Sequence, residues 1–294
     1  VLTYSGNTKD SITYTAISSD AGCTKTQTVK VVVRKCTVCT PDFTAPDTVC
    51  VGENVSLINL ATCASTNYWN FCSGNLNSTP TGTNIGNPSN NLNTPAGLGL
   101  GVDGTNYYAF ITNHFTQELI RLDFSNSYLN NPTSTNLGTF SNVIQKYVER
   151  LQIVKEGSNW YGFVVGGHDI EDSSRIVRLD FGGTLGNIPT ATNLGNIGLL
   201  SFPTDIYMFK DNSNIWHGLI TNFASGPVAP GDNTITRIDF NNGINNLPVG
   251  TNLGGFGLLN RPVGLHIIQE NNNNYLFVVN RNSNKLVRLD FGNT

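Results

Sequence analysis

Short hydrophobic runs that alternate with polar residues recur along most of this chain, separated by turn-forming residues. After an opening run comes a polar turn rich in Asn, Asp and Gly, and then a second run rich in aromatic residues. The opening runs are Ala96–Val102, Arg150–Val154, Asp205–Phe209 and Val263–Ile268, and the aromatic runs are Tyr107–Ile111, Trp160–Val165, Trp216–Ile220 and Tyr275–Val279. Alternating runs of this length, bounded by turn residues, predict β-strands joined by tight hairpins. The pattern predicts an all-β protein.

Two short phrases repeat in step with these runs. PTGTNIG, PTSTNLG, PTATNLG and PVGTNLG begin at Pro80, Pro132, Pro189 and Pro248, at intervals of 52, 57 and 59 residues. RLDF or RIDF begins at Arg121, Arg178, Arg237 and Arg288. A period near fifty residues is the length of a propeller blade. We therefore expect four-stranded blades in which RLDF is the third strand and TNLG the fourth.

The repeat is incomplete at both ends. The chain enters the array with a fourth strand, Pro80–Gly86, and leaves it just past Phe291, after three strands without a fourth. These halves could close the array as a ring of four blades, or the array could continue into further blades. We favour the second alternative and expect about four blades in this piece, with more in a longer chain.

The first quarter of the chain carries a different pattern. Ser11–Ala16 alternates and Thr26–Val33 is β-branched, so both are predicted strands of a small sandwich. A Pro-containing linker and a second strand-like start follow. We divide the chain into the end of a sandwich domain (1–35), a second, interrupted sandwich segment (36–74) and the propeller (75–294).

Composition narrows the class of protein. Charged residues make up 13% of the 294 residues, the net charge is −3 and the sequence pI is 5.8, so a nucleic-acid partner is not expected. No apolar run reaches the roughly 18–20 residues of a membrane span. The six cysteines all precede residue 73, and no nearby histidine or second CxxC completes a zinc site around Cys36 and Cys39. We expect disulfides of an exported protein, with the pairing left open.

Two stretches resemble a known protein class. CVGENVSL (Cys50–Leu57), YWNF (Tyr68–Phe71) and AGCTKTQTVKVVV from Ala21 resemble PKD-like, immunoglobulin-type domains of bacterial surface proteins. RIVRLDFGGTLGNIPTATNLGNIG from Arg175 resembles the propeller repeats of large secreted Bacteroidota proteins that end in a type 9 secretion sorting domain. The resemblance implies PKD-like segments before the propeller and export through that machinery. It also implies a place outside a Gram-negative cell, secreted or on the outer surface.

The repeated charged residues are assigned to the scaffold. An aspartate present once per blade at one strand position (Asp123, Asp180, Asp239, Asp290) is best explained by turn capping or packing. The arginines two positions earlier are expected to pair with neighbouring blades or with the aspartate. The Trp and Tyr residues of the second strands are expected to pack between blades rather than to form a platform for a sugar. No catalytic motif, cofactor site or metal site is predicted.

Loops between second and third strands vary in length, and variable loops on a rigid scaffold tend to carry recognition. This places a mildly acidic, polar candidate site for a glycan or surface partner on one mouth of the propeller. Its residues are His114, His168, Asp169, Glu171, Asp172, Asp232 and Arg281. Neutral drift of surface loops explains the same variation equally well.

We expect a non-enzymatic secreted or surface protein that serves in adhesion or in binding of extracellular polymer. One alternative is a propeller enzyme such as a glycosidase, polysaccharide lyase or phytase-like phosphatase. Such an enzyme would break the blade symmetry with non-repeated carboxylates or histidines at the axis. Another is a passive spacer, or cargo of the secretion machinery.

Overall fold

The computed structural model describes residues 10–20, 23–33, 43–44, 58–60, 79–168, 172–211, 213–223, 231–241, 243–270 and 273–292. The chain divides into two compact units, Val1–Thr81 and Gly82–Thr294. In the first unit β1 (Asp10–Asp20) and β2 (Cys23–Val33) form an antiparallel hairpin, and β3 (Phe43–Thr44) pairs with β4 (Ile58–Asn59). The two strands expected in residues 1–35 lie in this hairpin. The other sandwich strands and the cysteine side chains lie outside the described residues.

The second unit contains four antiparallel sheets, here called blades 1 to 4, preceded by a short 3₁₀ turn, η1 (Pro88–Asn90). Blade 1 comprises β5 (Pro95–Asp103), β6 (Asn106–Asn113), β7 (Leu119–Asp123) and β8 (Thr133–Gly138). Blade 2 comprises β9 (Val148–Glu156), β10 (Asn159–His168), β11 (Asp172–Gly182) and β12 (Thr190–Gly195). Blade 3 comprises β13 (Pro203–Lys210), β14 (Trp216–Asn222), β15 (Thr234–Phe240) and β16 (Val249–Gly254). Blade 4 has β17 (Pro262–Glu270), β18 (Asn273–Asn280) and β19 (Lys285–Asp290).

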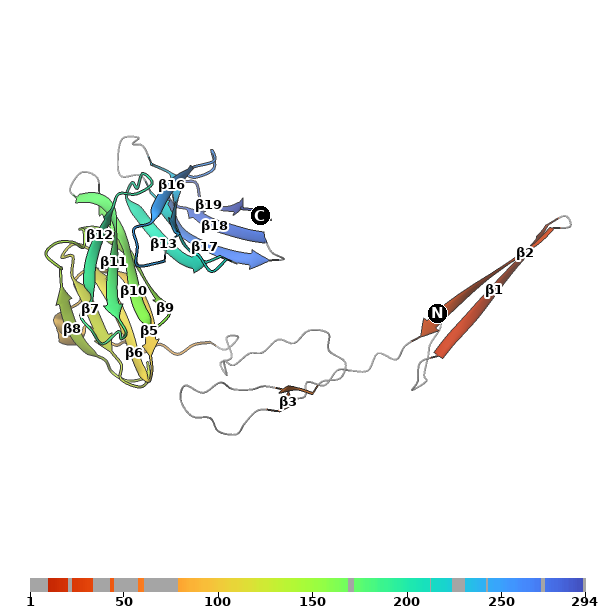
Figure 1. Ribbon diagram of the computed structural model, residues 1–294, viewed down its shortest axis with the longest axis horizontal. Coiled ribbons are helices and arrows are strands. Elements are labelled where there is room, and N and C mark those ends of the chain that lie inside the picture. The colour runs from red at the N-terminus through yellow and green to blue at the C-terminus, as the bar shows by residue number, and fades with distance from the viewer. Residues whose placement is uncertain are drawn as a thin grey trace. The chain divides into compact units, whose positions relative to one another are not determined.

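The strands of each blade follow chain order, and the blades fan out from their first strands (Figure 1). These inner strands, β5, β9, β13 and β17, contact one another in that order, as in a β-propeller. The all-β class, the blade order and the positions of the third and fourth strands are therefore as predicted.

The hydrophobic cores lie between adjacent blades. Phe110 of blade 1 packs in one cluster with Phe181 of blade 2, and their ring centroids are 4.7 Å apart. Phe163 of blade 2 packs in the same way with Phe240 of blade 3, at 5.4 Å. All four rings are buried. Trp160 of β10 belongs to the first cluster and Trp216 of β14 to the second, and their indole N–H groups donate to Asp103 of blade 1 and Glu156 of blade 2. The predicted packing of these Trp residues between blades is therefore confirmed.

The TNLG phrase forms the same turn each time. In Asn136, Asn193 and Asn252, the side-chain oxygen accepts the N–H of the glycine two residues later at 2.8 Å. Those glycines have φ of +90°, +86° and +83°. Glycine adopts this left-handed conformation without a Cβ clash, and the asparagine holds it in place.

The RLDF phrase is also structural. The carboxylates of Asp123, Asp180 and Asp290 accept the N–H two residues later at 2.8, 2.9 and 2.8 Å. Arg121 donates to carbonyl oxygens of the β11–β12 loop of blade 2, and Arg178 to those of the β15–β16 loop of blade 3. The predicted turn capping and pairing with neighbouring blades are confirmed at these positions.

Candidate active site

Every inner strand carries a β-bulge near its start. Relative to the second strand of its own blade, each has one extra residue: Ala96 in β5, Glu149 in β9, Thr204 in β13 and Val263 in β17. A bulge bends the strand and turns its side chains in a new direction. The extra residue and the next one read Ala-Gly in blade 1, Glu-Arg in blade 2, Thr-Asp in blade 3 and Val-Gly in blade 4. Charged side chains therefore occur at the bulge only in blades 2 and 3.

Asp205, the bulge carboxylate of blade 3, connects three inner strands. Its Oδ1 lies 3.3 Å from Nε of Arg150 in β9, and its Oδ2 accepts the backbone N–H of Leu265 in β17 at 3.0 Å. The N–H of Ile206 donates to Oδ1 at 2.9 Å. The Asp205 side chain is 16% exposed, whereas that of Arg150 is 51% exposed. A mostly buried carboxylate is thus held by three donors on one side of the array.

Glu149, the bulge carboxylate of blade 2, has fewer partners. Its Oε1 lies 3.6 Å from Nδ1 of His114, which follows β6 in blade 1. The same imidazole nitrogen lies 2.9 Å from the carbonyl oxygen of Val148, so the ring is held against the start of β9. Glu149 and His114 are 26% and 20% exposed. Solvent therefore reaches this carboxyl group, although most of it is covered.

Burial raises the pKa of both carboxyl groups. For Glu149, desolvation is opposed by the His114 imidazole. For Asp205, desolvation is opposed by the Leu265 N–H, the Arg150 guanidinium, the Ile206 N–H and the His266 imidazole. Donors and nearby positive charge favour the ionised form of a carboxyl group, and burial without them favours the protonated form. The pKa of both carboxyl groups is raised, but one group opposes the rise at Glu149 whereas four groups oppose it at Asp205.

A second repeated feature frames the bulges. The residue just before each inner strand has a left-handed φ: Thr94 (48°), Tyr147 (56°), Phe202 (42°) and Arg261 (51°). Its carbonyl oxygen accepts a backbone N–H at the end of the second strand of the same blade or just after it, at distances of 2.9 to 3.1 Å. The donors are His114, Gly167, Phe223 and Arg281. Non-glycine residues rarely adopt this conformation, and such strain concentrates at functional sites.

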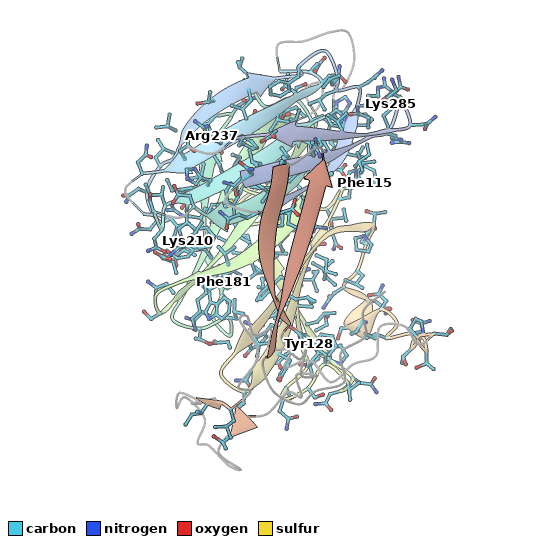
Figure 2. The ribbon with its side chains drawn as sticks, turned by 90° about the vertical axis from the view of Figure 1, so that its right-hand side faces the viewer. Phe115, Tyr128, Phe181, Lys210, Arg237 and Lys285 are labelled. Carbon is cyan, nitrogen blue, oxygen red and sulfur yellow. The ribbon has the colours of Figure 1, made fainter. Side chains whose placement is uncertain are left out.

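These positions place a continuous row of rings beside the bulges. We call the aromatic arc the set His114, Phe115, Tyr147, His168, Phe202 and Phe223. Consecutive ring centroids from His114 through Tyr147, His168 and Phe202 to Phe223 are 5.3, 5.5, 5.3 and 5.6 Å apart. Phe115, labelled in Figure 2, is 51% exposed. The arc crosses blades 1, 2 and 3, and blade 4 adds guanidinium groups.

The structure brings together part of the site predicted from the variable loops. His114 and His168 both belong to the arc, and the guanidinium of Arg281 lies over the ring of Phe223 with its centre 5.8 Å from the centroid. The carboxylate of Asp232 accepts a hydrogen bond from the Ser201 hydroxyl, next to Phe202. Asp169 and Glu171 lie outside the described residues, as does the side chain of Asp172.

Sequence reasoning missed Glu149 and Asp205. Glu149 immediately precedes a predicted first strand and Asp205 begins one. A single charged residue at such a position does not indicate whether its side chain belongs to a site. Only the bulge, which repeats in all four blades, shows that they belong to equivalent residue pairs, Glu149 as the first member in blade 2 and Asp205 as the second in blade 3. The signal that could have found them is the aligned set AG, ER, TD and VG at the start of the four opening runs.

Among the described residues, no three His, Cys, Asp or Glu side chains are grouped so as to bind an ion. Within the same residues, no helix has the length and apolarity needed to cross a membrane.

Comparison with known proteins gives structural neighbours only. No family model and no curated protein matches the chain. It is similar to a thermostable family-43 glycoside hydrolase (10% identity, TM-score 0.45, 64% of this chain and 65% of that one). It is also similar to an exo-β-1,3-galactanase from Phanerochaete chrysosporium (13% identity, TM-score 0.45, 63% of this chain and 43% of that one). A third similar structure is the GH43_1 enzyme from Xanthomonas citri complexed with xylose (9% identity, TM-score 0.44, 68% of this chain and 70% of that one). The chain thus spans less than two thirds of the length of the first two.

These neighbours correct one prediction. We expected a non-enzymatic adhesion or polymer-binding protein, and the solved structures that resemble this chain are instead glycoside hydrolases. The prediction of a non-enzymatic protein is therefore contradicted by this comparison. At such identities and TM-scores the likeness transfers neither a catalytic residue nor a substrate to this chain, so any activity has to be argued from its own side chains.

Proposed function

We propose that this chain is a hydrolase that cleaves glycosidic bonds, with Glu149 and Asp205 as its two carboxyl groups. One observation carries the proposal. The bulge positions hold uncharged residues in blades 1 and 4, whereas blades 2 and 3 hold Glu149, Arg150 and Asp205. This is the break in blade symmetry, with non-repeated carboxylates on the inner strands, that distinguishes a propeller enzyme from a repetitive scaffold.

The surroundings assign the two roles. Glycoside hydrolysis uses one carboxylic acid to protonate the leaving oxygen and a second, ionised carboxylate to assist the attack on the sugar. Glu149 has one imidazole nearby and a pKa raised by burial, so it suits the acid. Asp205 is held by Arg150 and two backbone N–H groups, so it suits the carboxylate that takes a proton from the attacking water. The water oxygen then bonds to the anomeric carbon while the bond from that carbon to the protonated leaving oxygen breaks.

The aromatic arc supports a sugar substrate. The rings of Tyr147 and Phe202 lie in a row with the imidazoles of His114 and His168 next to the bulges, each ring tilted or edge-on to the next. Sites for organic ligands combine such aromatic walls with a few directed polar groups. A row that crosses three blades suits a chain of several sugar units rather than one small molecule.

The test uses purified full-length chain on a panel of soluble polysaccharides and nitrophenyl glycosides, with release of reducing ends as the readout. Glu149→Gln and Asp205→Asn should each lower kcat by at least about 10²-fold, the range for general acid–base groups. Asp180→Asn, which alters a carboxylate of the blade scaffold, is the matched control and should keep activity. Full activity in the two site variants, with their folding confirmed by circular dichroism, would reject the assignment.

Export is a separate proposal that rests on the sequence. We infer that PKD-like segments precede the propeller, that the chain passes through a type 9 secretion machinery, and that it works outside a Gram-negative cell on extracellular glycan. The resemblance of Cys50–Leu57 and of the RLDF repeats supports this, together with the six cysteines. Intact-mass analysis of freshly secreted protein with and without reductant tests it, because six free thiols would contradict an oxidising route.

A further inference from the structure

The last blade exposes a side chain that the other blades bury. The residue two positions before the RLDF arginine is Leu119 in β7, Ile176 in β11 and Ile235 in β15, and each is 0% exposed. In β19 the equivalent residue is Leu286, which is 65% exposed. In the complete blades this residue faces the glycine of TNLG on the fourth strand. Among the described residues, β19 pairs only with β18, so its outer edge is open.

The first blade exposes apolar side chains at the opposite end of the array. The residue after the bulge pair is Leu151, Ile206 and Leu265 in blades 2, 3 and 4, and these are 1%, 2% and 8% exposed. The equivalent Leu98 of β5 is 48% exposed, and Leu100 on the same strand is 55% exposed. Each internal junction buries this position against the preceding blade. Blade 1 therefore presents a junction surface without a partner among the described blades.

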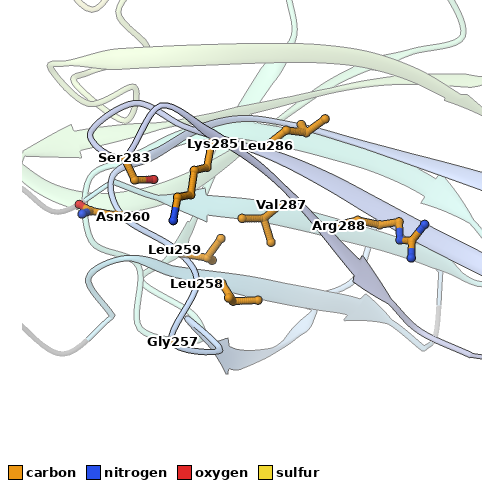
Figure 3. Close-up of a pocket in the computed structure, with 9 residues that line it drawn as sticks. All are labelled: Gly257, Leu258, Leu259, Asn260, Ser283, Lys285, Leu286, Val287 and Arg288. Carbon is orange, nitrogen blue, oxygen red and sulfur yellow. The ribbon is translucent and has the colours of Figure 1, made fainter.

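A cavity marks the open edge of blade 4. It has a volume of about 530 Å³ and lies between β19 and the segment 257–260 that leads into β17 (Figure 3). In complete blades the fourth strand occupies this place and touches the entering segment. In blade 1, Nδ2 of Asn91 in the entering segment donates to Oγ of Ser134 in β8 at 2.8 Å. In blade 3, Gly198 of the entering segment lies so close to Gly250 of β16 that a Cβ added to Gly250 would be 2.7 Å from the Gly198 backbone N. The cavity is thus the place of a fourth strand.

One segment of the chain has the form of that strand. Gly82–Gly86 reads GTNIG, and Oδ1 of Asn84 accepts the N–H of Gly86 at 2.8 Å, as in the other fourth strands. Gly86 has the same left-handed φ, +78°. The segment is exposed, and no strand pairs with it among the described residues. It already has the local geometry of the missing element.

The connection to blade 1 places this segment in an adjacent blade. The inner strand of blade 1 starts 9 residues after Gly86. At the three later junctions, the inner strand starts 10, 8 and 8 residues after the fourth-strand glycine of the preceding blade. A connection of this length joins neighbouring blades. In a ring of four, the blade next to blade 1 on its open side is blade 4.

We propose that Gly82–Gly86 binds the free edge of β19 as the fourth strand of blade 4 and closes a four-blade ring within one chain. The complete blades give the register, because Arg121, Arg178 and Arg237 each face the threonine of TNLG. Thr83 then faces Arg288, and Gly86 faces Leu286. Closure covers Leu286 and Leu98, both of which water now reaches, and it removes an open sheet edge.

A segment of the same chain is the favoured occupant for two further reasons. Its motif and turn match those of the three paired fourth strands, and four blades lie within the usual range for closed propellers. A tethered segment also acts at a high effective concentration that a second copy does not reach in dilute solution. A second copy and a strand of another blade are the competing occupants.

Engineered cysteines test the pairing and the register. Directly opposed residues have Cβ atoms about 4.5–5.5 Å apart, within reach of a disulfide. Thr83→Cys with Arg288→Cys should form a disulfide within one chain, identified by peptide mass mapping so that the native cysteines do not interfere. Thr83→Cys with Leu286→Cys is the matched control, out of register, and should not. A disulfide between two chains, equal linkage in both variants, or none in either overturns the proposal.

Hydrogen exchange on the unaltered chain provides a second test that does not depend on folded variants. If the ring is closed, peptides covering Gly82–Gly86 and β19 should be protected as strongly as those covering β8 and β7. Exchange of both peptides at least 10²-fold faster than their counterparts overturns the proposal. Protection that disappears on dilution points to a second copy and overturns it as well.

Discussion

Arg150 and Asp205 join two inner strands through a contact of 3.3 Å between the guanidinium Nε and the carboxylate Oδ1. The cation is half exposed, whereas the carboxylate is mostly buried. Because burial raises the pKa of Asp205 and the guanidinium opposes that rise, the charge of the carboxylate depends on a side chain that solvent reaches freely. At the junction of blades 2 and 3, the ionisation of the Asp205 carboxylate therefore depends on the position of the Arg150 side chain.

Removing the cation should change the pH dependence of hydrolysis. In Arg150→Ala the pKa of Asp205 rises further, because the opposing positive charge is gone. If Asp205 acts only when ionised, the acidic limb of the kcat/KM profile moves to higher pH. Arg150→Lys should restore part of the shift. A profile whose acidic limb is the same in all three proteins would exclude Asp205 as the ionised group.

Glu149→Gln should stabilise the folded chain at neutral pH. The folded-state pKa of Glu149 is raised by burial, so the ionised form destabilises the fold above that pKa, and the effect vanishes once the unfolded state is protonated too. We expect Tm to rise by ~1–3 °C at pH 7, with no difference near pH 3.5. Thermal melts at both pH values measure this.

Glu118→Gln is the matched control with the opposite sign. The Thr116 hydroxyl, together with the side chains of Asn136 and Asn113, lowers the pKa of Glu118. Its ionised form therefore stabilises the fold above the unfolded pKa, and the glutamine variant should melt lower than the parent at pH 7. Changes of the same sign in both variants would contradict this account of Glu149.

Asp180→Ala should weaken the fold without affecting catalysis. Its carboxylate holds the N–H of Gly182 at 2.9 Å in the turn after β11. Loss of one such bond costs about 1 kcal/mol. Urea unfolding should show that loss, and kcat should remain at the parental value. A stable variant without activity would move Asp180 from the scaffold to the site.

Trp216→Phe should lower the stability of the fold, and the size of that loss should depend on pH. The indole N–H donates to Oε2 of Glu156 at 3.0 Å, beside Nζ of Lys210 at 2.6 Å, and these donors lower the pKa of Glu156. The stabilisation exists above the unfolded pKa and disappears as pH falls through the folded one. We expect a loss of about 1 kcal/mol at pH 7, limited by solvent screening, and a smaller loss at pH 3. An equal loss at both pH values would show that ring packing alone matters.

Phe202→Gly should separate binding from chemistry. Phe202 has φ of 42° and carries a ring of the aromatic arc, 5.3 Å from His168 and 5.6 Å from Phe223. Glycine accepts this backbone conformation, so the ring is removed with little added strain. KM for a long oligosaccharide should rise several-fold while kcat changes little. A disaccharide substrate serves as the control, and an equal rise for both lengths would argue against a row of sugar contacts.

The repeated parts of the fold were predictable because repetition itself carries the signal. The asparagine and glycine of TNLG, such as Asn136 and Gly138, keep the same spacing in every repeat, so a shared turn follows from residue type alone. The arginine of RLDF, such as Arg121, repeats with the same period. The candidate site was not predictable in the same way. Glu149 and Asp205 lie in equivalent residue pairs because a bulge adds one residue to β9 and to β13, and a bulge shifts the side-chain pattern without leaving a distinctive residue behind.

The aromatic arc escaped prediction for a related physical reason. Tyr147 and Phe202 have left-handed φ, which residue type disfavours and which the carbonyl bonds to Gly167 and Phe223 impose. Local preference is overruled there by tertiary structure. The prediction from variable loops named His114 and His168, which both lie in the arc, although it offered no reason for rings to lie between them.

The residue with left-handed φ before each inner strand is a position whose side chain can differ from blade to blade. Its structural duty is performed by a backbone carbonyl, and the side chain takes no part in that bond. Thr, Tyr, Phe and Arg occupy the position in successive blades of one chain. Each blade therefore has one position beside its bulge where the hydrogen bond between the strand ends does not depend on the side chain. A library randomised at these four codons would sample new specificities on an unaltered framework.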